Sequence, residues 1–330
     1  MTPPSTAKMK QASATQPLQT MRGHTSRITG VAHLLDGRHI ITCSDDGSLR
    51  LWNLESGVQI GNDWHDDEKA GVWNISLSPN SKTVASGSRD GKVRLWDVET
   101  KKVVSRWTGH TDIVRSLCWS VDGERVVSGS NDGTIRVWNV ESGDTVLGPI
   151  KTGHLYLSAV IYSPDTTKIA TGGLDETSLK IWDAKTGNLL STIKHDYQVF
   201  SLAWTLDQKT FITGSYLSIR IFDTATWQQI AILRGHTSTV RSLSLFQNDR
   251  LLASGSFDKT ARLWNLDTNL PIGPPIQHED SVYSTAISAD GKQLVTGCAD
   301  KNAYVWDIHT TGLEDLLSIH DVNTSISIPS

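Results

Sequence analysis

Short apolar runs alternate with turn signals along most of the chain. Residues 83–86 and 92–96 are typical of these runs, which are rich in β-branched or small residues and are separated by turns at intervals of about 8–12 positions. Asp-Gly pairs at 46–47, 90–91 and 132–133 indicate tight hairpin turns, because glycine adopts a positive φ without steric cost. The pattern predicts an all-β chain of many short strands.

An aromatic residue followed by Asp or Asn divides the chain into repeats. The spacings between successive markers are 44, 42, 44, 40, 42 and 42 residues. The markers are Trp52, Trp96, Trp138, Trp182, Phe222, Trp264 and Trp306. A histidine lies upstream of each one, at His24, His65, His110, His154, His195, His236 and His278. Regular repeats of this length indicate one continuous repeat array rather than two domains.

These repeats resemble those of the WD40 family, whose Gly-His and Trp-Asp signatures recur every 40–45 residues or so. The resemblance covers about 290 of the 330 residues and implies a seven-bladed β-propeller with four antiparallel strands per blade. We expect the propeller to span residues 16–308, between a flexible N-terminal tail (1–15) and a C-terminal tail (309–330). The repeats also resemble those of G-protein β-type propellers and of fungal and bacterial NACHT-associated WD40 arrays.

Two segments compete to supply the last outer strand of the ring. Residues 17–24 resemble residues 103–110, which lead into the next repeat, whereas residues 312–319 resemble the segment that ends at His195. We expect the N-terminal segment to take this position, because joining the two chain ends leaves no open sheet edge.

By resemblance to the family, each repeat contains a hydrogen-bond chain from Trp through Ser or Thr and His to Asp. The expected sets are His24, Thr42, Asp46 and Trp52; His65, Ser86, Asp90 and Trp96; His110, Ser128, Asp132 and Trp138; His154, Thr171, Asp175 and Trp182; His236, Ser254, Asp258 and Trp264; and His278, Thr296, Asp300 and Trp306. Ser, His and Asp also form hydrolytic triads. A set that recurs in repeat after repeat is better explained as a structural network of buried polar groups.

The fifth repeat departs from this pattern. It is one residue short, has Phe222 in place of the tryptophan, and lacks the turn aspartate. Its network therefore cannot close, and we expect it to be the weak point of the ring.

Composition and charge exclude several classes of function. The net charge of −4 provides no basic face for nucleic acid, and no run of 18 apolar residues is available to span a membrane. Three cysteines form no disulfide framework and match no zinc spacing. We therefore expect no metal and no cofactor. We also expect a cytoplasmic location, with the nucleus as an alternative. The crowded residues 63–68 are interpreted as a solvated acidic loop.

Residues that differ between repeats are the candidates for binding. In WD40-like propellers the top face is lined by residues at fixed offsets from the histidine and the turn aspartate. These offsets select Trp73, Arg89, Arg115, Tyr156, Phe200, Arg241, Phe257 and Tyr283. Arg, Trp and Tyr are enriched at binding hot spots.

The leading hypothesis is a non-enzymatic, monomeric scaffold that binds a peptide or protein segment on this face. Alternatives are a ligand-sensing or assembly module related to NACHT-type signalling proteins, a substrate receptor of a ubiquitin ligase, or an enzyme that uses the central channel.

Overall fold

The structure, a computed structural model, describes residues 16–174, 179–246 and 248–308. The expected tails 1–15 and 309–330, including the competing strand 312–319, lie outside these ranges, as does Asp175. Within the described ranges every regular element is a β-strand and there is no helix. The all-β prediction is therefore confirmed.

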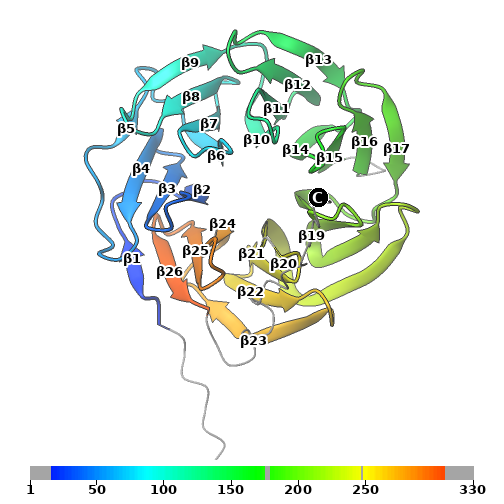
Figure 1. The fold of residues 1–330 in the computed structure, drawn as a ribbon. Coiled ribbons are helices and arrows are strands. Elements are labelled where there is room, and N and C mark those ends of the chain that lie inside the picture. The colour runs from blue at the N-terminus through cyan, green and yellow to red at the C-terminus, as the bar shows by residue number, and fades with distance from the viewer. Residues whose placement is uncertain (1–15, 175–178, 247, 309–330) are drawn as a thin grey trace, which may run out of the picture.

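The strands form six sheets arranged around a central channel (Figure 1). Four sheets take their strands in chain order. The first contains β2 (Ile28–His33), β3 (His39–Ser44), β4 (Ser48–Asn53) and β5 (Trp64–His65), and the second contains β6 (Val72–Leu77), β7 (Thr83–Ser88), β8 (Val93–Asp97) and β9 (Val103–Trp107). The third contains β10 (Val114–Trp119), β11 (Arg125–Ser130), β12 (Thr134–Asn139) and β13 (Thr145–Lys151), and the fourth contains β14 (Tyr156–Tyr162), β15 (Lys168–Leu174), β16 (Leu179–Asp183) and β17 (Leu189–Ile193). The fifth contains β18 (Val199–Trp204), β19 (Thr210–Asp223), β20 (Gln229–Leu245), β21 (Leu251–Ser256), β22 (Thr260–Asn265) and β23 (Leu270–Gln277). The sixth contains β1 (Gln19–Met21), β26 (Ala303–Asp307), β25 (Gln293–Cys298) and β24 (Val282–Ile287).

The prediction of seven four-stranded blades is wrong: the arrangement has six blades, and one of them has six strands. The fifth and sixth repeats share that sheet because β19 and β20 each run through positions that are turns in other repeats. Tyr216 stands where other repeats approach their turn aspartate, and its backbone pairs with Thr239 of the following repeat. The chain bends within β19, where Leu217 has a φ of +64°. The missing turn aspartate is the sequence feature behind this merger.

The ring is closed by the N-terminal strand, as predicted. β1 pairs antiparallel with β26, with Gln19 opposite Val305 and Met21 opposite Ala303. The Leu18 N–H also donates to the Val305 carbonyl at 2.7 Å, and Figure 1 shows the two ends of the described chain side by side. The last blade thus has a paired outer strand instead of an open edge.

Glycines allow tight turns and close packing between blades. Gly91 has a φ of +78°, and a Cβ there would lie 2.7 Å from the His110 carbonyl oxygen. Gly129 in β11 faces the next blade, where a Cβ would come within 2.1 Å of Leu157. Because neighbouring sheets approach this closely, their strands alternate small residues with the buried aliphatic residues that form a core between each pair of sheets.

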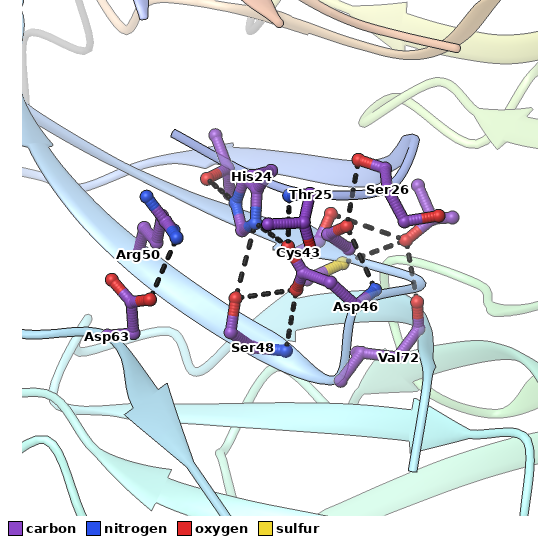
Figure 2. Close-up of polar contacts among 12 residues, drawn as sticks. His24, Thr25, Ser26, Cys43, Asp46, Ser48, Arg50, Asp63 and Val72 are labelled. Atoms are coloured by element: carbon purple, nitrogen blue, oxygen red, sulfur yellow. Dashed lines mark hydrogen bonds and ion pairs between the residues drawn. The ribbon is translucent and has the colours of Figure 1, made fainter. Parts of the chain in front are cut away.

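Three repeats contain the complete hydrogen-bond chain expected from the sequence. In the first, the Trp52 indole donates to Thr42 Oγ1 at 2.8 Å, and His24 bonds through Nε2 to Thr42 and through Nδ1 to Asp46, at 2.8 and 2.9 Å. Figure 2 shows His24, Asp46 and Ser48 joined in this network. The chains that contain His110 and His236 have the same contacts within 0.1 Å. Each chain supplies hydrogen-bond partners to the buried indole, hydroxyl and imidazole of its repeat.

The second repeat differs from the expected set. Trp96 donates to Ser86 at 2.8 Å, but His65 is exposed and lies near Asp63 instead. Asp66, the next residue, is buried and binds the buried Arg94 and the exposed Arg106. Arg94 also binds Asp90 at 2.6 Å. The proposed role of His65 is therefore wrong, and the loop interpreted as solvated contains a buried ion pair.

Other repeats complete their chains in part. His154 bonds to Thr171 at 3.1 Å and Trp182 to the same hydroxyl at 3.0 Å. In the last repeat His278 and Trp306 both bond to Thr296, but Asp300 accepts from the Tyr304 hydroxyl rather than from His278.

The fifth repeat replaces the missing aspartate with a backbone carbonyl. His195 bonds to Thr213 at 3.1 Å and through Nδ1 to the Tyr197 carbonyl at 2.8 Å. Its ring lies 6.2 Å from that of Phe222, between centroids, so the aromatic contact remains although the indole donor is absent.

Replacing Trp138 by Ala removes a side chain that is 2% exposed and stacks on Trp107 with 5.6 Å between centroids. We expect a loss of about 3–5 kcal/mol in the free energy of unfolding, measured with urea, from the cavity and the lost hydrogen bond. Ser128→Ala, which removes only the shared hydroxyl, should cost about 1–3 kcal/mol. An unchanged unfolding midpoint in Trp138→Ala would contradict this account.

The second-repeat ion pair gives a paired test on adjacent residues. Asp66→Asn leaves the Arg94 guanidinium, whose side chain is 2% exposed, without its buried partner, and we expect a loss of about 3 kcal/mol. His65→Ala should change the free energy of unfolding by less than about 0.5 kcal/mol. If both variants lost the same free energy of unfolding, His65 would have to contribute to the structural network.

Candidate functional site

A β-bulge in each innermost strand places one side chain at the mouth of the central channel. The pairing between the first and second strand of the repeat shifts register at these positions. The bulged residues are Thr29, Trp73, Arg115, Ser158, Phe200, Arg241 and Tyr283. Bulges redirect side chains and are common beside functional sites. Five of the eight predicted binding residues belong to this set.

Trp73 is the centre of a cluster of arginines. Its side chain is 7% exposed, because the guanidinium carbons of Arg27, Arg89 and Arg115 lie 5.0, 5.0 and 4.3 Å from its ring centroid. Such contacts are attractive because the ring face carries negative charge. Trp73 is therefore a platform for arginines and not itself an exposed residue. We call Trp73, Arg27, Arg89, Arg115 and Asp45 the Trp73 cluster.

Asp45 fixes two of these arginines. Arg89 donates to both of its carboxylate oxygens, at 2.6 and 2.8 Å, and Arg27 donates to Oδ2 at 2.7 Å. The Arg89 guanidinium is partly exposed, and its hydrogen bonds to Asp45 raise the pKa of Arg89. Arg115 instead donates to the Asn131 amide oxygen at 2.7 Å. The cluster thus joins the first three repeats at the channel mouth.

Aromatic residues continue the cluster on the other side of Arg27. Its guanidinium carbon lies 5.1 Å from the Tyr283 centroid and its Nη1 donates to the Tyr283 hydroxyl at 3.1 Å. Phe257 packs against Tyr283 with 4.9 Å between centroids. Arg241 donates to the Phe200 carbonyl at 3.2 Å. The structure therefore brings seven of the eight predicted residues to the channel mouth, all except Tyr156.

Tyr156 begins the innermost strand β14 and is exposed, and it does not belong to the lining of the channel mouth. Its backbone pairs with Leu174, and both side chains are exposed. Tyr197 and Tyr216 of the next repeat are 48% and 45% exposed, with 5.7 Å between their centroids. Gln198 links the two repeats by donating to Ser158 at 3.0 Å. We call Tyr156, Leu174, Tyr197 and Tyr216 the tyrosine rim.

Sequence reasoning missed Arg27, Tyr197 and Tyr216. Tyr216 precedes the turn position used to select Arg89 and Phe257, but the absence of an aspartate in the fifth repeat concealed the equivalence. Arg27 lies two residues before Thr29, the same offset that selects Tyr156 before Ser158, so the repeat pattern does mark its position. Tyr197 lies three residues before Phe200, and no periodic signal marks it.

No group of three or more His, Cys, Asp or Glu side chains suited to a metal ion occurs in the part of the chain that the structure describes. Over the same residues, the structure has no helix of the length and apolar character needed to cross a membrane.

Comparison with known proteins identifies several relatives. The chain is 29% identical over 280 residues to the ribosome biogenesis protein WDR12 homolog of Trichoplax adhaerens, covering 74% of this chain and 64% of that protein. It is 25% identical over 261 residues to Protein FIZZY-RELATED 3 of Arabidopsis thaliana, covering 77% and 53%. It is 29% identical over 208 residues to eukaryotic translation initiation factor 3 subunit I of Botryotinia fuckeliana (strain B05.10), covering 59% and 61%. The chain thus spans about half to two thirds of these relatives.

A family model gives the broadest match. The model described as WD domain, G-beta repeat matches residues 15–53, 62–97, 101–139, 147–183, 227–265 and 272–307. The segment between the fourth and fifth matches contains Phe222, which is consistent with the degenerate fifth repeat. Because these matches cover more than half of the residues, the chain belongs to the WD40-repeat family.

Proposed function

We propose that this protein is a non-enzymatic scaffold that binds a segment of a partner protein on the channel-mouth face. The observation that carries the proposal is the tyrosine rim, where Tyr156, Tyr197 and Tyr216 are each at least 45% exposed. Tyrosine supplies a large contact area at low entropic cost and is enriched at hot spots. Exposed aromatic groups suit apolar side chains of a bound segment, and the arginines of the Trp73 cluster suit acidic ones.

The relatives support a role in assembly. One of them is named as a subunit of a translation initiation factor, and a propeller of this family offers a rigid surface on which a partner can dock. The chain covers only part of that protein. The partner of the present protein therefore has to be identified by experiment.

The buried networks argue against hydrolysis by the recurring Ser-His-Asp sets. Ser128 and Ser254 are 0% exposed, and each accepts the indole N–H of its tryptophan. A hydroxyl in this position cannot reach a substrate carbonyl, whereas a catalytic serine must.

A comparison of variants tests the proposed surface. The triple variant Tyr156→Ser, Tyr197→Ser, Tyr216→Ser removes three exposed rings and should reduce recovery of specific partners by roughly tenfold or more, because hot-spot truncations cost at least about 2 kcal/mol each. Recovery is measured by quantitative pull-down at equal bait concentration, followed by titration of each recovered partner as purified protein.

The matched control changes exposed apolar residues elsewhere. Val121 and Leu206 are 68% and 59% exposed and belong to turns at the opposite ends of the strands, so Val121→Ser with Leu206→Ser should leave recovery unchanged. If the tyrosine and control variants recover the same partners at equal yield, the rim is not the binding surface. Substrate turnover abolished by a point substitution would contradict the non-enzymatic assignment.

A further inference from the structure

The mouth of the central channel is a polar cavity with an unusual charge balance. Its volume is about 220 Å³, and the innermost strands of all the blades line it. Its charged lining residues are Arg115 and Arg241, and the lining includes no carboxylate. Several hydroxyls of the lining are already used between neighbouring repeats: Ser116 accepts from the Val160 N–H and Ser201 from the Leu243 N–H, both at 3.0 Å.

Neither lining arginine has an ion-pair partner among the described residues. Arg115 donates to the Asn131 amide and Arg241 to the Phe200 carbonyl, both of which are neutral acceptors. Of the nearby carboxylates, Asp45 is bound to Arg27 and Arg89, and Asp112 is exposed. The guanidinium groups at the mouth therefore outnumber the carboxylates that neutralise them.

Burial makes this imbalance costly. Burial, and then the charge of Arg115, lowers the pKa of Arg241 to about 10. Burial, and then the charge of Arg89, also lowers the pKa of Arg115. A guanidinium without a counter-charge in such a site destabilises the folded state, and a bound anion would remove that cost.

We propose that the channel mouth binds a free phosphate-type anion with at least two negative charges, held by Arg115 and Arg241. The guanidinium fork matches the oxygen atoms of such anions. Tyr283 also lines the cavity. Its hydroxyl accepts a hydrogen bond from Arg27, which leaves the hydroxyl proton to donate to the anion. The volume is enough for a phosphate or diphosphate with several waters, at about 30 Å³ per water. This site does not depend on whether a protein binds the tyrosine rim.

Calorimetric titration of the full chain with inorganic diphosphate, inorganic phosphate and acetate at constant ionic strength tests the proposal. We expect diphosphate to bind more tightly than phosphate, and acetate more weakly than either. Arg241→Gln and Arg115→Gln should each weaken diphosphate binding by roughly tenfold or more, since each removes charge-assisted hydrogen bonds. Arg125→Gln removes the same charge from an exposed arginine at the opposite end of β11 and should leave the affinity unchanged.

Thermal unfolding separates loss of binding from loss of folding. In anion-free buffer, Arg241→Gln should melt at or above the temperature of the wild type, because the variant lacks a half-buried charge with no ion-pair partner among the described residues. Added diphosphate should raise the melting temperature of the wild type and not that of Arg241→Gln. Arg241→Lys keeps the positive charge but lacks the planar guanidinium group. The rise in its melting temperature on adding diphosphate should lie between those of the wild type and Arg241→Gln.

Three outcomes would overturn the proposal. They are equal diphosphate affinity in the wild type and Arg241→Gln, no saturable binding of diphosphate at millimolar concentration, and tight binding of a phosphoserine peptide when the free anions do not bind. The last would assign the site to a phosphorylated partner.

Discussion

The fold depends on pairing the outermost strand of the last blade with the first ordered strand of the chain. Each blade buries both of its faces against neighbours, so removing one pairing would expose a sheet edge and loosen the cores on either side. Only three residues of β1 carry this pairing. Met21, which is 1% exposed, adds the side-chain packing that anchors it.

Within this closed ring, hydrogen bonds and ion pairs between buried side chains hold the strands of each repeat together. Complete chains from tryptophan to aspartate occur where the loop before the innermost strand has its regular length. In the second repeat, where the loop from His65 to the innermost strand at Val72 is longer, Arg94 and Asp66 form an ion pair instead. In the last repeat the loop has the regular length, but Asp300 accepts from Tyr304 and not from His278. What these repeats share is a hydrogen-bonded or ion-paired buried group at this place, and not one particular set of residues.

The channel mouth combines rigidity with charge. Bulges in the innermost strands direct arginines and aromatic residues toward one point, and Asp45 fixes two of the arginines over Trp73. The tyrosine rim differs in that its side chains are exposed. The structure thus combines a cavity lined by two arginines with a separate set of exposed tyrosines.

The repeat pattern by itself determined the all-β fold, the family and most residues at the channel mouth, whereas for ring closure it left two candidate segments, of which the structure pairs the N-terminal one. This was possible because strand periodicity and turn chemistry are local properties that repeat along the chain. Only the tertiary structure decided that the fifth and sixth repeats share one sheet, that Asp66 and not His65 enters the interior, and that Trp73 is covered by arginines. A shift of one residue in a short loop exchanges a buried side chain for an exposed one. Which side chains then meet depends on contacts between repeats that lie about 40 residues apart, or at opposite ends of the chain.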